Sequence, residues 1–335
     1  MPTQASVSPI AGTNGSVSSK TIHQFANLLD WAENIAVRPN GNLLVTLLGL
    51  KPQLWQIAEP WTDTPAATLV HTFPSELYGL VGIAETSPDV FVTAGINTTT
   101  PSLSSVWEVT FGTDDNDGSE SVATRKIADM HNAIVLNGVA AVPGCGDEPS
   151  SSSAVLIADS MAGVVFRVDT QTGNVTTAAQ VPEMAPLGNM TSTQNIGING
   201  IKIRDGYLYF DNSYAATLYR VKIDETGFVA ADAVAENVAV ISDETFLDDF
   251  VFDTRGNIYI ASNHGSTVRR VDMATGDNVV LAGAAGQQTV LGDTAAAFGR
   301  TDMDREVLYV TTSGFDVKTA VEPGKVVAIN VAGLK

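Results

Sequence analysis

The chain has one cysteine, Cys145, so it cannot form an internal disulfide bond. That residue sits in the loop Pro143–Asp147, and no base near it in the sequence would activate the thiol as a nucleophile. We therefore interpret Cys145 as an incidental loop residue. Disulfide-framework folds and thiol catalysis are both disfavoured.

Basic residues are scarce. The 335 residues include 18 Lys and Arg against 37 Asp and Glu, which gives a net charge of −19 at pH 7. A field of that sign repels phosphate backbones and anionic lipid surfaces, so neither nucleic acid nor a membrane is an expected partner. The excess of carboxylates serves solubility, and net charge alone does not indicate a cation site.

Several other signals are missing. No apolar run reaches the roughly 18 residues of a membrane span, and the polar stretch Met1–Ser19 lacks the apolar core of a signal peptide. There is no HExxH motif, Gly-x-Ser-x-Gly elbow or Walker loop, and the four histidines are scattered. However, Asn-x-Ser/Thr sequons begin at Asn14, Asn97, Asn174 and Asn189. These favour a secreted glycoprotein trimmed of its leader over a cytoplasmic protein.

What is present is a repeat. Short β-rich segments bounded by Gly, Asn, Asp and Pro recur in units of four. The second segment of each unit reads LLVTL from Leu43, VFVTA from Val90, VLIAD from Val155, LYFDN from Leu208, IYIAS from Ile258 and LYVTT from Leu308. These starts step by 47, 65, 53, 50 and 50 residues, and two polar insertions account for the 65. Units of four strands at this period are typical of propeller blades.

The sequence thus predicts an all-β fold, a six-bladed β-propeller with four-stranded blades. The last unit has no fourth strand because the chain stops at Lys335, and the segment Thr21–Ala26 has strand character. We expect that segment to supply the missing outer strand, closing the ring and covering an open edge. Residues 1–20 are expected to be a flexible segment and residues 21–335 a single domain.

Inner strands of a propeller begin at one mouth of its axis, so residues at their starts converge. Four of the six starts carry oxygen ligands: Glu33, Asn137, Asn199 and Asp248. Carboxylates and amide carbonyls suit Ca²⁺, Mg²⁺ or Mn²⁺, and Asp248 or Asp249 could then act as a general base. The alternative is that these side chains cap tight strand entries by bonding local backbone groups.

The segments INGIKIRDGYLYFDNSYAATLYRVKID and LDDFVFDTRGNIYIASNHGSTVRRVD resemble the gluconolactonase, senescence-marker and strictosidine-synthase superfamily of six-bladed propellers. The resemblance covers nearly the whole chain from Thr21. It implies that a divalent cation is held at the mouth by one Glu, two Asn and one Asp, which match Glu33, Asn137, Asn199 and Asp248. Glu33-Asn34-Ile35 and Leu247-Asp248-Asp249 depart from the superfamily's usual Glu-x-Pro and Pro-Asp-Gly, so lactone hydrolysis does not simply carry over.

Within that superfamily, ENIAVRPNGNLLVTLL and VLIADSMAGVVFRVDTQTG are similar to a fungal subgroup of secondary-metabolite proteins. The subgroup includes the hetero-Diels–Alderases of tropolonic sesquiterpene biosynthesis. The resemblance implies a cyclase that joins an o-quinone methide to a humulene-type alkene, with small apolar organic substrates as its partners and no cofactor required.

Loops predicted to face the same mouth are apolar and aromatic. The expected substrate-binding residues are Trp31, Tyr78, Met161, Phe246, Phe298 and Phe315, with Leu48 and Leu50 beside them. A pericyclic reaction needs two apolar partners held in a reactive pose and a hydrogen-bond donor at the carbonyl. We expect that donor, the catalytic group, to come from Tyr214, His264 or Asn263. The alternative is that about half of these aromatics only pack between blades.

Three functional hypotheses remain at this stage: a cofactor-free hetero-Diels–Alderase, a metal-dependent lactonase or related hydrolase, and a non-catalytic binding propeller. The apolar loops and the subgroup resemblance favour the first. The four oxygen ligands favour the second, and a retained structural ion would reconcile the two. Fold analogy alone does not choose among them, because propellers host many functions.

Overall fold

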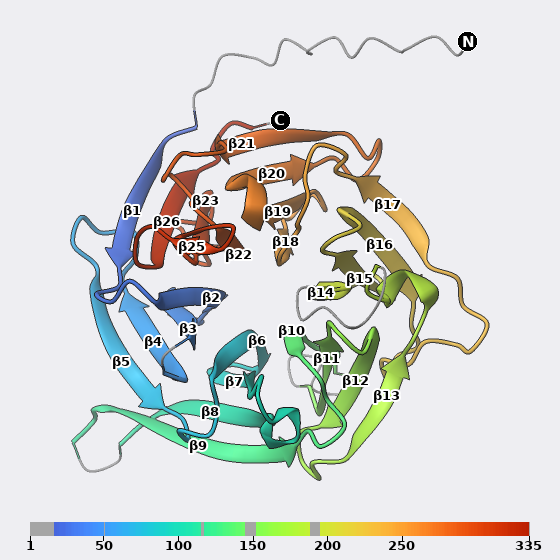
Figure 1. Ribbon diagram of the computed structural model, residues 1–335. Coiled ribbons are helices and arrows are strands. Elements are labelled where there is room, and N and C mark those ends of the chain that lie inside the picture. The colour runs from blue at the N-terminus through green and yellow to red at the C-terminus, as the bar shows by residue number, and fades with distance from the viewer. Residues whose placement is uncertain (1–16, 50, 115–116, 145–151, 188–194, 335) are drawn as a thin grey trace, which may run out of the picture.

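The computed structural model describes residues 17–49, 51–114, 117–144, 152–187 and 195–334. Its strands form six four-stranded antiparallel sheets arranged in a ring, as predicted (Figure 1). The innermost strands of the blades are β2 (Asp30–Val37), β6 (Gly79–Ser87), β10 (Leu136–Ala141), β14 (Ile198–Arg204), β18 (Phe250–Phe252) and β22 (Asp293–Phe298). The second strands are β3 (Leu43–Gly49), β7 (Val90–Ile96), β11 (Ala154–Asp159), β15 (Tyr207–Asn212), β19 (Ile258–Ser262) and β23 (Val307–Thr312).

The outer half of each blade completes the repeat. The third strands are β4 (Gln53–Ala58), β8 (Ser105–Thr113), β12 (Val164–Asp169), β16 (Thr217–Lys222), β20 (Thr267–Val271) and β26 (Lys325–Asn330). The outermost strands are β5 (Ala66–Thr72), β9 (Glu120–Asp129), β13 (Val175–Ala179), β17 (Glu236–Val240), β21 (Asn278–Gly283) and β1 (Ser19–Gln24). Short extra elements are the hairpin β24 (Phe315–Asp316) and β25 (Thr319–Ala320) and the 3-10 turns η1 (Pro101–Leu103), η2 (Pro182–Met184) and η3 (Asn263–Gly265).

The ring closes through the two ends of the chain. Strand β1 pairs antiparallel with β26, with Ser19 opposite Ile329 and Gln24 opposite Lys325, so the sixth blade has the order β1-β26-β23-β22. The predicted closing segment is confirmed, and the strand begins two residues earlier than predicted, at Ser19. Because β1 covers β26, the last blade presents no open third strand to another chain.

The core lies between the blades. A separate cluster of buried apolar side chains fills the space between each neighbouring pair of sheets. Leu44 and Phe91, for example, meet between blades one and two, and Tyr309 of blade six packs against blade one. Each sheet is therefore buried on both faces, which accounts for the nearly continuous apolar runs of the second strands.

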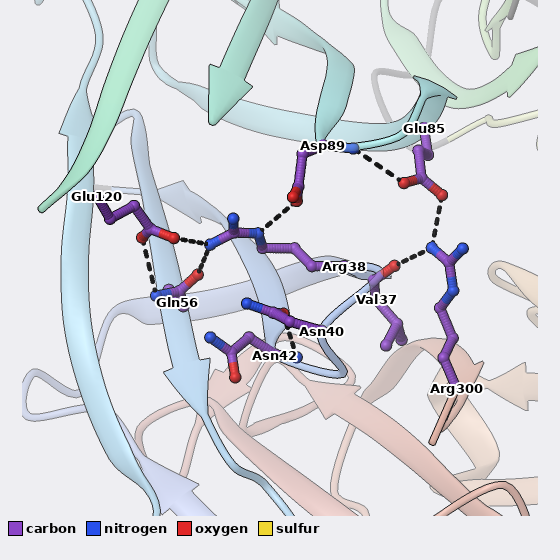
Figure 2. Close-up of polar contacts among 9 residues, drawn as sticks. All are labelled: Val37, Arg38, Asn40, Asn42, Gln56, Glu85, Asp89, Glu120 and Arg300. Atoms are coloured by element: carbon purple, nitrogen blue, oxygen red, sulfur yellow. Dashed lines mark hydrogen bonds and ion pairs between the residues drawn. The ribbon is translucent and has the colours of Figure 1, made fainter. Parts of the chain in front are cut away.

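Polar contacts link blades one and two near the carboxyl ends of their inner strands (Figure 2). Arg38, which follows β2 and is 3% exposed, donates from Nε to Asp89 Oδ1 at 2.7 Å. Its Nη1 donates to Gln56 Oε1 and to Glu120 Oε2, both at 2.6 Å. The guanidinium also lies 3.8 Å from the centroid of the Phe111 ring. A single buried cation thus links the β2–β3 turn and β4 to the second blade.

Arg300 extends this contact to the sixth blade. Its Nη1 donates to Val37 O at 2.8 Å and to Glu85 Oε2 at 2.5 Å (Figure 2). The other oxygen of Glu85 accepts from the Asp89 backbone N–H at 3.2 Å. Three blades therefore share one charged network where the ring closes.

Some sequence features fall outside this description. Cys145, Leu50 and the sequons at Asn14 and Asn189 lie among the residues that the structure does not describe. Of the other sequons, Asn97 donates its amide to Glu76 O at 2.6 Å, and Asn174 is exposed between β12 and β13. No described helix has the length and apolar character that a membrane crossing requires.

Candidate active site

A cavity of about 320 Å³ lies at the mouth where the inner strands begin. It brings together most of the residues expected there. The expected catalytic residues that line it are Tyr214, Asn263 and His264, and the expected substrate-binding residues are Trp31, Tyr78, Met161 and Phe246, with Leu48. The four oxygen ligands Glu33, Asn137, Asn199 and Asp248 line the same cavity. Residues separated by more than 200 positions thus share one pocket.

Phe298 does not belong to this cavity, so that prediction is wrong. It is the last residue of β22, whose first residue, Asp293, lies at the mouth. Five residues of extended strand span roughly 16 Å, which carries Phe298 to the opposite end of the blade. There its ring packs edge-on against Tyr259, with centroids 5.1 Å apart. Phe315 lies close to the mouth but behind Trp31, at a tilted ring contact of 5.2 Å.

β-Bulges determine the direction in which side chains of the inner strands point. The pairing of β2 with β3 shifts register between Ala32 and Asn34, and that of β14 with β15 shifts between Ile198 and Ile201. Equivalent shifts occur in the inner strands of blades two, three and six. A bulge adds an unpaired residue and turns its side chain out of the ladder. Here those residues include Glu33, Asn137 and Asn199.

One wall of the cavity is a packed aromatic trio. Phe246 stacks on His264 with centroids 4.7 Å apart and meets Tyr214 edge-on at 5.1 Å. Burial raises the pKa of Tyr214. Burial, together with the charge of Lys318, lowers the pKa of His264. Near neutral pH both groups are therefore uncharged, and each can offer a hydrogen bond as a neutral donor.

The floor of the cavity is a hydrogen-bonded amide–carboxylate set. Asn199 Nδ2 donates to Asp248 Oδ1 at 3.1 Å and to Ser213 Oγ at 3.0 Å. Asn263 Nδ2 donates to Asp248 Oδ2 at 3.2 Å. Both amide nitrogens are thus engaged below the pocket, and Asn263 is a poorer candidate donor to a substrate than Tyr214 or His264.

Glu33 is the second buried acid of the floor. Burial is the main cause that raises its pKa to about 7, the neighbouring Asp249 adds to it, and the Trp31 indole acts in the opposite direction. Trp31 Nε1 faces this carboxylate without a hydrogen bond of ordinary geometry, and Glu33 Oε2 has no partner among the described residues. Burial, and next the charge of Glu33, raise the pKa of Asp248 well above its usual range. Two acids this close cannot both hold a charge at low cost.

These residues fit a hard cation. Glu33 Oε2 and Asn199 Oδ1 are buried oxygens without a hydrogen-bond donor, and they line the same cavity as Asn137 and Asp248. In the described part of the chain no three His, Cys, Asp or Glu side chains form a metal-binding group. A cation here would thus depend on amide oxygens, which suit calcium and magnesium better than zinc.

Asp249 is turned away from the cavity, so it is not placed to act as a base there. Its Oδ2 accepts from Asn34 Nδ2 at 3.0 Å, and its Oδ1 pairs with Lys202 Nζ at 2.5 Å. Asp248 and Asp249 thus face opposite ways, as successive residues of an extended chain do. These contacts of Asp249 join blades one, four and five.

One wall of the cavity was not predicted from the sequence. The β24–β25 hairpin of blade six places Val317 and Lys318 against the cavity, and Lys318 is the only lysine or arginine among the described lining residues. Val317 has φ 53°, a left-handed conformation that is strained for a β-branched residue. Strain of this kind is often retained where a loop contacts a ligand. The neighbouring Phe315, which we did place at the mouth, was the available signal.

Comparison with known proteins bears on this pocket. No protein-family model matches the chain. A protein of Phoma sp named as a hetero-Diels-Alderase is 34% identical over 334 residues, covering 90% of this chain and 89% of its own. A second protein so named, asR5 of Sarocladium schorii, is 32% identical over 349 residues, covering 94% and 84%. The chain belongs to the hetero-Diels-Alderase family. The sequence resemblance and the prediction of a cyclase are thereby confirmed.

Solved structures support the fold alone. Regucalcin of Agrobacterium tumefaciens, titled a calcium-binding protein, has a TM-score of 0.58 at 18% identity and covers 93% of both chains. A gluconolactonase-family structure has a TM-score of 0.58 at 13% identity, covering 94% of this chain and 92% of its own. This hetero-Diels-Alderase family member therefore shares its propeller fold with a protein titled calcium-binding and with a gluconolactonase-family structure, and the shared fold does not transfer their chemistry.

Proposed function

We propose that this hetero-Diels-Alderase couples an o-quinone methide of tropolone type to a humulene-type sesquiterpene alkene in the mouth cavity. The observation that carries the proposal is the cavity itself, where an aromatic wall with two neutral donors, Tyr214 and His264, faces apolar side chains. Such a pocket suits a reaction of two apolar partners that involves no charged nucleophile.

The chemistry is a concerted cycloaddition. The carbonyl oxygen and the exocyclic carbon of the quinone methide each form a bond to one carbon of the alkene. Three π bonds become two σ bonds and one π bond, and no proton or leaving group departs. The protein contributes by holding the partners in a reactive pose, worth about 7–11 kcal/mol at most. It also contributes by donating a hydrogen bond to the carbonyl oxygen as electron density collects there.

Tyr214 is the donor we favour. Its raised pKa keeps the phenol protonated, and edge contact with Phe246 holds the ring against the cavity. His264 stacks on the same Phe246 ring and is the second candidate. Lys318, on the β24–β25 hairpin and close enough to His264 to lower its pKa, adds a positive charge near the developing oxyanion.

We expect Tyr214→Phe to lower kcat/KM for the coupling roughly 10-fold, the worth of one hydrogen bond. The matched control is Tyr207→Phe, which removes the same hydroxyl from a tyrosine of blade four outside the cavity. The measurement is the rate of adduct formation above the uncatalysed reaction, with the diastereomer ratio as a second readout. Equal rates for both variants would remove Tyr214 from the reaction, and no acceleration by the natural protein would overturn the proposed function.

A divalent cation on Glu33, Asn137, Asn199 and Asp248 is proposed as a structural ion. When bound, it would neutralise the floor acids and supply Lewis acidity. The four residues would hold the ion. They would keep the floor in the same orientation with or without a substrate oxygen on the ion. The rival hydrolase function draws on the same residues, and it requires the ion for turnover.

Exhaustive chelation should therefore leave the coupling rate within about twofold, since no water has to be activated. The same treatment should lower Tm if the ion is bound, because a ligand of the folded state stabilises it. The measurement pairs elemental analysis with coupling and lactone-hydrolysis assays before and after chelation. A lactonase activity that follows the metal content would favour the hydrolase, and a loss of coupling that returns with Ca²⁺ would show that the ion takes part in the coupling rather than being structural.

A further inference from the structure

A second, smaller cavity adjoins the first at blades one and two. It measures about 190 Å³ and shares three wall residues, Trp31, Leu48 and Tyr78, with the main cavity. Its remaining walls are Leu29, Gly49 and Phe315. We refer to this cavity as the apolar recess. Because three side chains form walls of both spaces, the two cavities are direct neighbours that meet at Trp31.

The two spaces differ in chemistry. The main cavity contains the floor acids, the donors Tyr214 and His264 and the ammonium group of Lys318. Among the described residues, the apolar recess is lined by no charged side chain; the Trp31 indole N–H is buried and faces Glu33, which leaves the Tyr78 hydroxyl as the polar side-chain group of the recess. A ligand that bridges them therefore meets polar groups at one end and hydrocarbon at the other.

The recess also exposes apolar surface. Leu29 is 43% exposed and Tyr78 is 50% exposed, although most large apolar side chains of the chain are buried. Clustered apolar exposure at the rim of a pocket is typical of a ligand-binding groove. Phe315 packs against Trp31 at 5.2 Å, which fixes the back of the recess as a rigid aromatic surface.

The main cavity is small for two substrates bound together. A pocket for one drug-sized ligand measures roughly 300–1,000 Å³, and the main cavity of about 320 Å³ lies at the lower end of that range. Two partners must be bound together for a cycloaddition, so the main cavity alone is small for the task. The adjoining recess supplies the missing space without any movement of the blades.

Resting on the proposed function, we infer that the apolar recess is the subsite for the hydrocarbon partner, and that the oxygenated partner occupies the main cavity against Tyr214, His264 and Lys318. The β24–β25 hairpin contributes to both subsites, since Phe315 lines the recess and Lys318 lines the main cavity. The hairpin thereby sets which end of the mouth receives which partner. The reacting bond pair then lies at Trp31, the boundary between the two spaces.

The test replaces one recess residue and its neighbour in sequence. Leu29→Asn puts an amide into the wall of the recess, and Leu28→Asn makes the same change at a residue that is 48% exposed and lines neither cavity. We expect Leu29→Asn to raise KM for the humulene-type partner roughly 10-fold, the loss of one apolar contact. KM for the quinone-methide partner should stay within about twofold, and Leu28→Asn should match the natural protein.

Lys318→Met provides the reciprocal variant. It should raise KM for the quinone-methide partner and leave KM for the hydrocarbon partner unchanged. If Leu29→Asn affects both partners equally, affects only the quinone methide, or acts no differently from Leu28→Asn, the assignment of subsites is overturned. Each result is read on variants that keep the circular dichroism and Tm of the natural protein.

Direct binding separates this inference from the proposed function. Calorimetric titration with a humulene-type alkene alone, and with tropolone alone, needs no turnover. Weaker binding of the alkene to Leu29→Asn, with tropolone binding unchanged, supports the recess even if coupling is never seen. Coupling by the natural protein with unaltered alkene binding by Leu29→Asn supports the function and rejects the recess.

Discussion

Replacing Arg38 by Met should lower the free energy of unfolding by about 3 kcal/mol. The guanidinium is buried and donates to Asp89, Gln56 and Glu120 (Figure 2). Removing one partner of a buried ion pair costs about 3–5 kcal/mol, because the remaining charges lose their partner. Asp89 and Glu120 are themselves partly exposed and regain some hydration, which places the expected loss at the lower end. Methionine keeps an apolar stem of similar length but loses the contact of the guanidinium with the Phe111 ring.

The matched control is Arg125→Met. Arg125 also pairs with a carboxylate, Glu108, and its side chain is 49% exposed. Both variants remove one positive charge from a chain of net charge −19, so general repulsion changes equally. Denaturant unfolding should show a change of about 0.5 kcal/mol or less for Arg125→Met. A similar loss in both variants would mean that net charge, rather than the buried contact, sets the stability of this junction.

The fold could be predicted because its signals are local. Each second strand has five to seven residues and begins with at least three apolar ones, and turn residues such as Asp169–Gly173 separate the strands within a blade, so these signals lie close together in the chain. Closure of the ring could be predicted because the sixth blade lacked its outer strand and one predicted strand, Thr21–Ala26, belonged to no other blade. None of these signals depends on a contact between residues that are far apart in the sequence.

The site could be predicted only where position along a strand was enough. Glu33, Asn137, Asn199 and Asp248 lie within a few residues of the starts of inner strands, and all four line the cavity. Phe298 ends such a strand, and its aromatic character alone placed it wrongly at the mouth. Lys318 was missed because a hairpin tip carries no repeat signal.

The direction of individual side chains could not be predicted from the sequence either. Asp248 and Asp249 are neighbouring residues of the same type. Asp248 nevertheless lines the cavity, whereas Asp249 pairs with Lys202 below it. Bulges in the inner strands break the two-residue alternation that would otherwise indicate direction. The Arg38 network was likewise invisible, because its partners lie 18 to 82 residues away along the chain.

Gly138→Ala should damage both stability and coupling. A Cβ at this position would lie 2.6 Å from Asn199 O and 2.9 Å from Ile201 N, both backbone atoms of the next inner strand. A backbone cannot move aside as a flexible side chain does, so we expect a loss of about 3 kcal/mol, the upper part of the range for overpacking. The added methyl group pushes on Asn199, whose amide is bonded to Asp248 at 3.1 Å. Displacing the floor by about 1 Å would lower kcat roughly 100-fold.

Gly112→Ala is the control for this change. Gly112 lies in β8, and a Cβ there would meet only the Ser121 hydroxyl, at 3.2 Å, which can rotate away. This variant should keep the rate of the natural protein and gain slightly in Tm, because alanine restricts the unfolded chain. Unfolding and coupling assays on the two variants then separate a general effect of glycine loss from the local one. If Gly138→Ala couples as fast as Gly112→Ala, the position of Asn199 is not what shapes the reacting pocket, and the aromatic wall alone must hold the two partners.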